Sequence, residues 1–268
     1  MDSSYKEIPW HFKDEHIVLC DRVNSCLSLT EDERFSALIV KEKYKKVPSG
    51  LFGYLPWVGK DYYSFNTRLF VVGESYYKGE GNENPKHDEY GRALIAEWMC
   101  LEPNMDTYAR LFSAIRPVIG DEKTHRESLC SSLVFLNLIQ RCLMTPSGKE
   151  AQDFINGWGS FFKAVEILRP KLCVFIGVES KKYLQDGITE AKKTMGISIK
   201  TAEERVVKPG KIDNCWTHPL VRLEIDGGQS VTLLWLKHSS RSFAPEIWHK
   251  EFLMCSKEFN EWRTSSNR

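Results

Sequence analysis

Polar side chains that could carry out chemistry follow four short apolar runs of the chain. They are Glu74 and Ser75 after Leu69–Val72, Asn137 at the end of Leu133–Leu138, Gly177 and Glu179 after Leu172–Ile176, and His238 after Val231–Leu236. An amide can bind the edge of a polar ring by donating and accepting hydrogen bonds. A carboxylate and a histidine can stabilise charge that develops in a transition state. The set therefore indicates a site for polar catalysis or recognition.

The elements that must position these side chains are predicted from the apolar pattern. Continuous apolar runs of this length are typical of strands buried on both faces of a parallel sheet. Ala151–Leu168 has the apolar periodicity of a helix, and Pro245 is well placed to open a last helix with Ile247, Trp248, Phe252 and Phe259. Strands that alternate with helices imply a doubly wound α/β domain. Its ligands bind beyond the carboxyl ends of the strands, where the polar residues converge.

The remaining segments are expected to decorate one domain that spans residues 1–268. Thr30 and Glu33 have the spacing of a capping box before a helix with Phe35, Leu38 and Ile39. We therefore expect residues 1–60 to form a helical extension and a loop. Residues 197–228 are less regular, which predicts a loop-rich insertion or a hairpin.

Composition limits the classes of protein that fit. The formal net charge is +1, so affinity for nucleic acid would have to come from local basic patches. The eight cysteines include no CxxC pair, which favours reduced thiols over disulfides or a zinc site. No apolar run approaches the ~20 residues that span a bilayer. The polar first ten residues contain no signal-peptide core. We expect a cytoplasmic protein without a membrane partner or a metal.

The segments around the polar residues resemble the motifs of the uracil-DNA glycosylase superfamily. Residues 70–79, FVVGESYYKG, are similar to its first motif, written G-Q-D-P-Y-H-G or G-E-x-P-G. The other three are VFLNLI at 134–139, LRPKLCVFIG at 168–177, and LKHSSR at 236–241, which resembles the H-P-S motif. The four motifs occur in the family's order and cover roughly residues 68–250. The resemblance implies a three-layer α/β/α fold with a short, mostly parallel four-stranded sheet.

The resemblance also implies an activity, hydrolysis of the N-glycosidic bond of a flipped-out pyrimidine in DNA, which leaves an abasic site. Asn137 would read the base edge, and His238 would face the base and stabilise the departing group. Glu74 would stabilise the oxocarbenium-like sugar, with Ser75 as a water ligand. Two alternatives stay open: Asn137 could close a strand-end turn, and Glu74 could only brace its loop.

The first motif departs from the uracil-specific pattern at Ser75 and Tyr76, which replace an aspartate and a proline. Tyr77 matches the tyrosine that walls off the C5 side of the pyrimidine. These changes indicate a remodelled pocket for a larger base, such as a modified cytosine of phage DNA, and hence a role in phage defence. Tyr76 could equally serve in packing.

The resemblance places further residues against duplex or single-stranded DNA. Phosphate contacts are expected from Lys78, Arg141, Lys237 and Arg241, and contacts along the strand from Ser239, Ser240 and Phe243. Arg241 and Phe243 would enter the gap left by the flipped nucleotide. Each cation could instead be a solvated surface charge. Some branches of the superfamily bind an iron–sulfur cluster, but Cys20 and Cys26 have the wrong spacing for one. We expect no cofactor, and a monomer.

Two other functions fit parts of the same pattern. Gly73-Glu74-Ser75 also resembles the G-D-S block of SGNH-type ester hydrolases, in which Ser75 would be the nucleophile and His238 its base. That family places an aspartate three residues before the histidine, where this chain has Trp235. The second alternative is an inactive DNA-binding module that senses a modified base, since fold does not imply activity.

Overall fold

A computed structural model defines the fold. It describes residues 25–28, 32–42, 45–77, 92, 106–115, 122–205, 212–213, 220–238 and 243–265. The predicted residues Thr30, Lys78, Ser239, Ser240 and Arg241 lie outside the described part, as do the chain before residue 25 and the side chain of Tyr77.

The four predicted strands are present and parallel. They are β2 (Leu69–Gly73), β4 (Leu133–Asn137), β6 (Leu172–Ile176) and β9 (Gln229–Leu236), and they lie side by side in the order β4-β2-β6-β9. All residues of β2, β4 and β6 are buried, as their continuous apolar sequences require. The α/β class is confirmed.

The sheet is larger than expected, so the prediction of a four-stranded sheet is wrong. It has seven strands and is mixed. β1 (Trp57–Val58) pairs antiparallel with β4, while β8 (Leu220–Ile225) pairs antiparallel with β9 and β7 (Ile199–Arg205) with β8. The expected insertion at 197–228 thus contains two strands of the main sheet. Residues 200–204 of β7 are exposed, which explains why their sequence lacks an apolar run.

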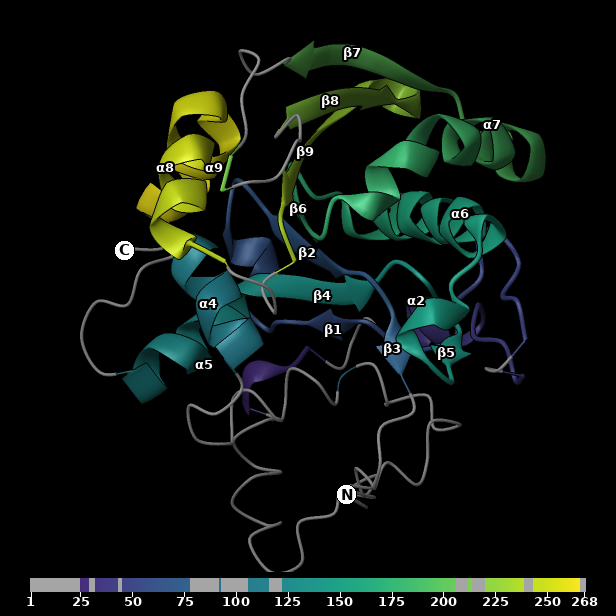
Figure 1. The fold of residues 1–268 in the computed structure, drawn as a ribbon, viewed down its shortest axis with the longest axis horizontal. Coiled ribbons are helices and arrows are strands. Elements are labelled where there is room, and N and C mark those ends of the chain that lie inside the picture. Colours follow the sequence, from purple (N-terminus) through teal and green to yellow (C-terminus); the bar gives the residue numbers. More distant parts are fainter. Residues whose placement is uncertain are drawn as a thin grey trace, which may run out of the picture.

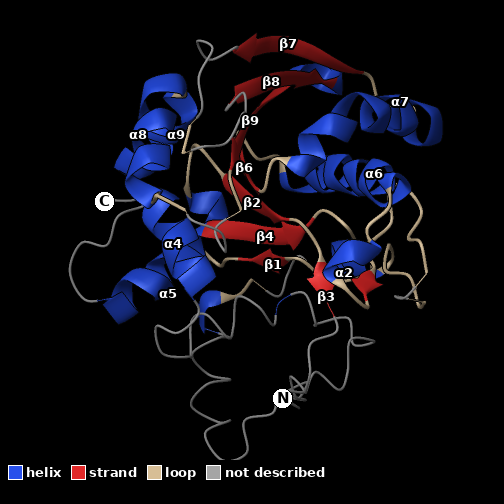
Figure 2. Ribbon diagram, viewed as in Figure 1, coloured by secondary structure: helices blue, strands red, loops and turns tan. Residues whose placement is uncertain are grey.

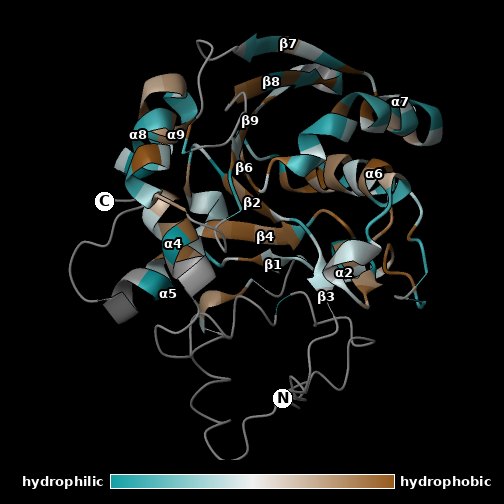
Figure 3. Ribbon diagram, in the orientation of Figure 1, coloured by the Kyte–Doolittle hydropathy of each residue, from teal (hydrophilic) through white to brown (hydrophobic). Residues whose placement is uncertain are grey.

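Helices cover both faces of the sheet, which gives three layers (Figures 1 and 2). One face packs against α6 (Ala151–Leu168) and α7 (Leu184–Met195). The other packs against α4 (Asp106–Ile115), α5 (Glu122–Ser132), α8 (Pro245–Cys255) and α9 (Lys257–Ser265). Phe70 and Val72 face the first layer, whereas Leu69 and Val71 face the second, because strand side chains alternate. Figure 3 shows the apolar central strands between these layers.

The last helix differs from the prediction because it is two helices. α8 ends at Cys255, and Ser256 has an extended backbone before α9 begins. The Ser256 hydroxyl accepts a hydrogen bond from the Phe259 amide at 3.1 Å, which caps the new helix. Trp248, Phe252 and Phe259 nevertheless all lie in the core, as the predicted stripe requires.

Short elements complete the described chain. They are α2 (Asp32–Ser36), η2 (Tyr62–Ser64), η3 (Pro146–Gly148), η4 (Glu179–Tyr183), η5 (Asp226–Gly228), and the parallel pair β3 (Tyr76–Tyr77) and β5 (Cys142–Leu143). None of the described helices is long and apolar enough to cross a membrane.

The strand order places a topological switch point at the carboxyl edge of the sheet, between β2 and β6. From β2 the chain moves to β4 on one side and then to β6 on the other. The connections after β2 and β6 therefore diverge, which opens the point at which doubly wound sheets bind ligands. Glu74 directly follows β2 and Gly177 directly follows β6, so both lie at this point.

Candidate functional site

Lys149 lies between two carboxylates at the carboxyl edge of the sheet. Glu74 follows β2, Glu179 opens η4 after β6, and Lys149 precedes α6. The Lys149 ammonium donates to Glu74 Oε1 and, at 3.1 Å, to Glu179 Oε2. The side chains of Glu74 and Lys149 are only 13% and 19% exposed, so this contact is shielded from water. Three separate elements thus converge on one ion-pair network.

The carboxylates determine the charge of Lys149. Burial lowers the pKa of its ammonium, but the hydrogen bonds and charges of Glu74 and Glu179 outweigh burial and raise the pKa above its ordinary value. Lys149 is therefore a cation at neutral pH.

Gly177 brings Glu74 and His238 together. A Cβ atom built on Gly177 would lie 3.1 Å from Glu74 Oε2 and 3.7 Å from His238 Cδ2. The two side chains therefore flank the same small volume, which any residue with a side chain would occupy. The φ angle of Gly177 is +93°, a conformation that favours glycine. The predicted convergence of Glu74 and His238 at one rim is found.

Asn137 holds the loop that follows β2. Its Nδ2 donates to the Ser75 carbonyl at 3.0 Å, and its backbone amide donates to the Tyr76 hydroxyl at 3.2 Å. The side chain is packed over Gly73, where a Cβ would overlap Oδ1. This arrangement matches the alternative in which Asn137 closes a strand-end turn. The contact uses one of the amide's two donor hydrogens.

Ser75 and Tyr76 are buried beside Asn137. Tyr76 is 1% exposed and lies against Tyr54, with ring centroids 4.4 Å apart. Ser75 is 9% exposed, and its carbonyl receives the Asn137 amide. Tyr76 therefore has the packing environment of the alternative stated for it, in a small cluster with Cys142.

Two cations predicted to contact phosphate, Arg141 and Lys237, contact aspartate residues instead. Arg141 donates to both carboxylate oxygens of Asp153, at 2.6 and 2.7 Å, and this bidentate contact raises its pKa despite burial. Lys237 donates to the carbonyl of Asp213 at 3.2 Å. Both side chains are partly buried, at 14% and 20% exposed, so neither is a fully solvated charge.

Phe243 lies in the core. It is 8% exposed and stacks on Trp248 of α8, with centroids 6.4 Å apart. Phe243 was expected to enter the gap that a flipped nucleotide leaves in the duplex, and its packing on α8 differs from that expectation. The apolar face of α8 provides the reason, because packing there removes the ring from water.

Sequence reasoning missed Lys149, although its position at the rim could be predicted. In a parallel α/β unit, the helix after a strand begins at the carboxyl edge of the sheet. Lys149 comes two residues before the helix predicted at Ala151, so it belongs to the same rim as Asn137. Its single positive charge in a polar loop carried no pattern that distinguished it.

Comparisons with known proteins give no family for this chain. Neither a protein-family model nor a curated protein matches it. Within the described ranges, no group of three or more His, Cys, Asp or Glu side chains could hold a metal ion.

Proposed function

We propose that the protein is a DNA glycosylase that hydrolyses the N-glycosidic bond of a flipped-out pyrimidine and leaves an abasic site. The observation that carries the proposal is the approach of Glu74 and His238 to one small volume over Gly177. This volume lies beyond the carboxyl ends of parallel strands, where such folds bind ligands. The four motifs in register support the same assignment.

Glu74 has a suitable environment for stabilising the sugar. Departure of the base leaves positive charge on the sugar ring, which a fixed carboxylate stabilises. The side chain is 13% exposed, so water screens this interaction less than at the surface. Lys149 fixes one carboxylate oxygen, Oε1, while Oε2 faces the volume over Gly177. The second oxygen is therefore the one proposed to act.

His238 is proposed to act on the departing base. It follows β9 and lies across Gly177 from Glu74, so the two side chains could address the two products of bond cleavage. Negative charge develops on the base as the bond breaks, and a donor aimed at that charge contributes strongly to catalysis. His238 would donate to the base while Glu74 stabilises the sugar.

We favour a modified cytosine, such as those of phage DNA, over uracil as the excised base. The support is the sequence of the first motif, in which Ser75 and Tyr76 replace the aspartate and the proline of the uracil-specific pattern. Excision of such a base would make phage DNA the substrate and phage defence the biological role.

An excision screen tests the proposal. Duplexes with one uracil, one mismatched thymine or one modified cytosine, and single strands with one uracil or one modified cytosine, are incubated with the protein and then treated with alkali. Strand cleavage at the modified cytosine is expected. Glu74→Gln and His238→Ala should each lower the rate at least about 100-fold, the size of acid–base and electrostatic contributions. Glu166→Gln, an exposed carboxylate on α6, is the matched control.

Other outcomes would support the alternative functions. Absence of cleavage across the panel would contradict the glycosylase assignment. Turnover of a p-nitrophenyl ester, lost in Ser75→Ala, would support an ester hydrolase. Tight DNA binding without either activity would support a module that senses modified bases. Circular dichroism of each variant must show that it is folded.

A further inference from the structure

Asp213 has an unusual backbone and is well anchored. It lies between β7 and β8 with a φ angle of +48°, in the left-handed region that few residues other than glycine adopt. Its neighbour Ile212 is 8% exposed and belongs to the same core as Trp248. A strained conformation of this kind persists only when surrounding contacts enforce it.

Within the described part of the chain, three groups contact Asp213. The carboxylate oxygen Oδ2 accepts a hydrogen bond from the Ala244 amide at 3.1 Å and from Trp248 Nε1 at 3.3 Å. The backbone carbonyl accepts a hydrogen bond from Lys237 Nζ at 3.2 Å. The Asp213 side chain is 11% exposed, so these contacts are largely shielded from water.

These contacts join Asp213 to the end of β9 and to the start of α8. Lys237 immediately precedes His238, and Ala244 is the residue from which α8 begins. We propose that Asp213 is a positioning residue for His238, because it binds Lys237 and ties it to the start of α8; we call these contacts the Asp213 clamp. The catalytic consequence of this proposal rests on the proposed function, whereas the structural consequence does not.

The energetics favour this role. Fixing Lys237 to the start of α8 removes conformations in which the adjacent His238 would lie away from Glu74. A displacement of about 1 Å at a catalytic group is enough to cost about 100-fold in rate. A negative charge at the start of α8 also interacts favourably with the helix dipole. Asparagine and aspartate tolerate the left-handed region better than other side chains, which limits the cost of the strain.

Two substitutions separate the carboxylate from the backbone. Asp213→Gly relieves the positive φ and removes the acceptor, so it should fold but lower kcat for base excision at least about tenfold, with little change in KM. Asp213→Asn keeps an oxygen acceptor and tolerates the same φ, so it should retain activity within about threefold. A higher KM with an unchanged kcat would overturn the proposal. Equal activity of Asp213→Gly and the unaltered protein would also overturn it.

A double substitution tests whether Asp213 acts through His238. Asp213→Gly should lower activity much less in the His238→Ala background than in the unaltered protein, because the group that it positions is already gone. Losses that multiply would contradict the proposal. Asp226→Gly is the control, since Asp226 also accepts a backbone hydrogen bond, from Ser198 at 2.7 Å, but belongs to the exposed turn η5. It should change neither kcat nor KM.

Hydrogen exchange separates this proposal from the proposed function. Amides in a peptide that covers residues 237–248 should exchange faster in Asp213→Gly than in the unaltered protein or in Asp226→Gly. This result is expected even when no DNA base is excised, in which case the glycosylase assignment fails and the clamp stands. Unchanged exchange in Asp213→Gly would overturn the clamp.

Discussion

The contacts of Lys149 determine whether its side chain can act as a nucleophile. A lysine acts as a nucleophile when its surroundings lower the pKa, because the neutral amine attacks. Here the contacts with Glu74 and Glu179 raise the pKa above its ordinary value. The folded-state value lies above the unfolded one, so the pair's stabilising contribution is complete at neutral pH and is lost as pH rises through the raised pKa. Lys149 is thus suited to holding Glu74.

The raised pKa predicts that strand cleavage by the protein requires added alkali. A lysine nucleophile would form an imine with the sugar, which borohydride reduces to a permanent adduct. When the protein is incubated with the oligonucleotide and borohydride at neutral pH, we expect no protein–DNA adduct on a denaturing gel. A glycosylase that forms such an imine serves as the positive control. An adduct that disappears in Lys149→Met would contradict the prediction.

Removal of the Lys149 charge should impair the site without unfolding the protein. In Lys149→Met, Glu74 and Glu179 lose the cation between them, so Glu74 is no longer held toward Gly177. We expect excision to fall about tenfold or more, since a displaced catalytic group is costly. Lys163→Met, on an ion pair elsewhere on α6, is the control and should be neutral. Equal losses in the two variants would indicate that Lys149 has no special role.

At the scale of elements, the contact between α6 and α7 depends on a glycine. A Cβ on Gly187 of α7 would overlap the side chain of Trp158 on α6. Alanine improves helix propensity by about 1 kcal/mol, but overpacking costs about 1–3 kcal/mol. Gly187→Ala should therefore lower the free energy of unfolding, measured with urea. Thr189→Ala, exposed on the same helix, should be neutral or stabilising. A more stable Gly187→Ala would show that the two helices separate easily.

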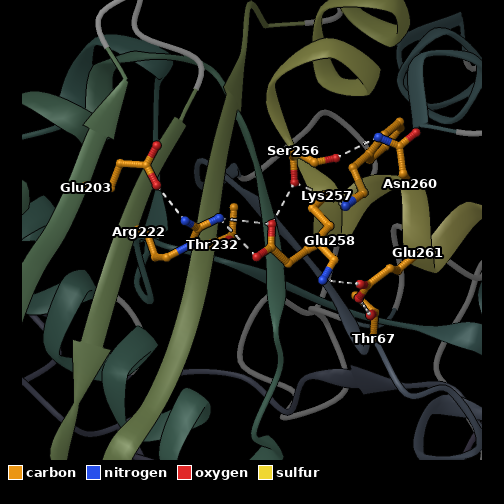
Figure 4. Close-up of polar contacts among 10 residues, drawn as sticks. Thr67, Glu203, Arg222, Thr232, Ser256, Lys257, Glu258, Asn260 and Glu261 are labelled. Carbon is orange, nitrogen blue, oxygen red and sulfur yellow. Dashed lines mark hydrogen bonds and ion pairs between the residues drawn. The ribbon is translucent and has the colours of Figure 1, made fainter.

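Hydrogen bonds and ion pairs of Arg222 connect the C-terminal helix α9 to the sheet. Arg222 of β8 contacts Glu203 of β7, the hydroxyl of Thr232 on β9, and both carboxylate oxygens of Glu258 on α9, at 3.1 and 3.3 Å (Figure 4). The Arg222 side chain is 30% exposed, so solvent weakens each pair.

Arg222→Met should lower the free energy of unfolding by about 1 kcal/mol, because several charge-assisted hydrogen bonds are lost together. The measurement is again urea denaturation. Lys257→Met is the comparison, because its ion pair with Glu261 belongs to an 83% exposed side chain and should contribute little. A loss in Lys257→Met as large as that in Arg222→Met would argue against a dedicated fastening role.

The sequence predicts the elements that are buried on both faces. β6 and α6 have the predicted bounds, because an apolar run and an apolar helical stripe mark their whole length. β7 could not be predicted in this way, since its residues at the edge of the sheet are exposed and polar. The break at Ser256 was missed because the apolar stripe continues on both sides of it.

The site was predictable only where a residue directly follows a strand. Glu74 and His238 could be placed on one rim because parallel strands end at the same edge of a sheet. Lys149 and Asp213 contact the site residues or their flanks from loops without a regular pattern. Their positions depend on tertiary contacts between segments far apart in the chain. Phe243 lies close to His238 in the sequence, but this proximity did not predict that its ring packs on α8.

At the scale of the whole molecule, both edges of the sheet are unfavourable for pairing with another chain. The edge strand β1 has two residues, and the other edge strand, β7, carries Lys200, Glu203 and Glu204 on exposed positions. Short and charged edges discourage association through strands. Figure 1 shows these two strands at opposite ends of the sheet. Association through the edge strands of this sheet is therefore disfavoured.

Charge distribution across the molecule predicts a weak dependence of DNA binding on salt. The net charge is +1, and two of the four cations expected to contact phosphate, Arg141 and Lys237, are engaged by Asp153 and Asp213. Each phosphate neutralised contributes about −0.9 to the slope of log K against log salt, so the two remaining cations predict a slope of about −2. Fluorescence anisotropy with a duplex that carries an uncleavable abasic analogue, between 50 and 200 mM salt, measures it. A slope of about −6 or steeper would show that many more cations bind phosphate than this arrangement provides.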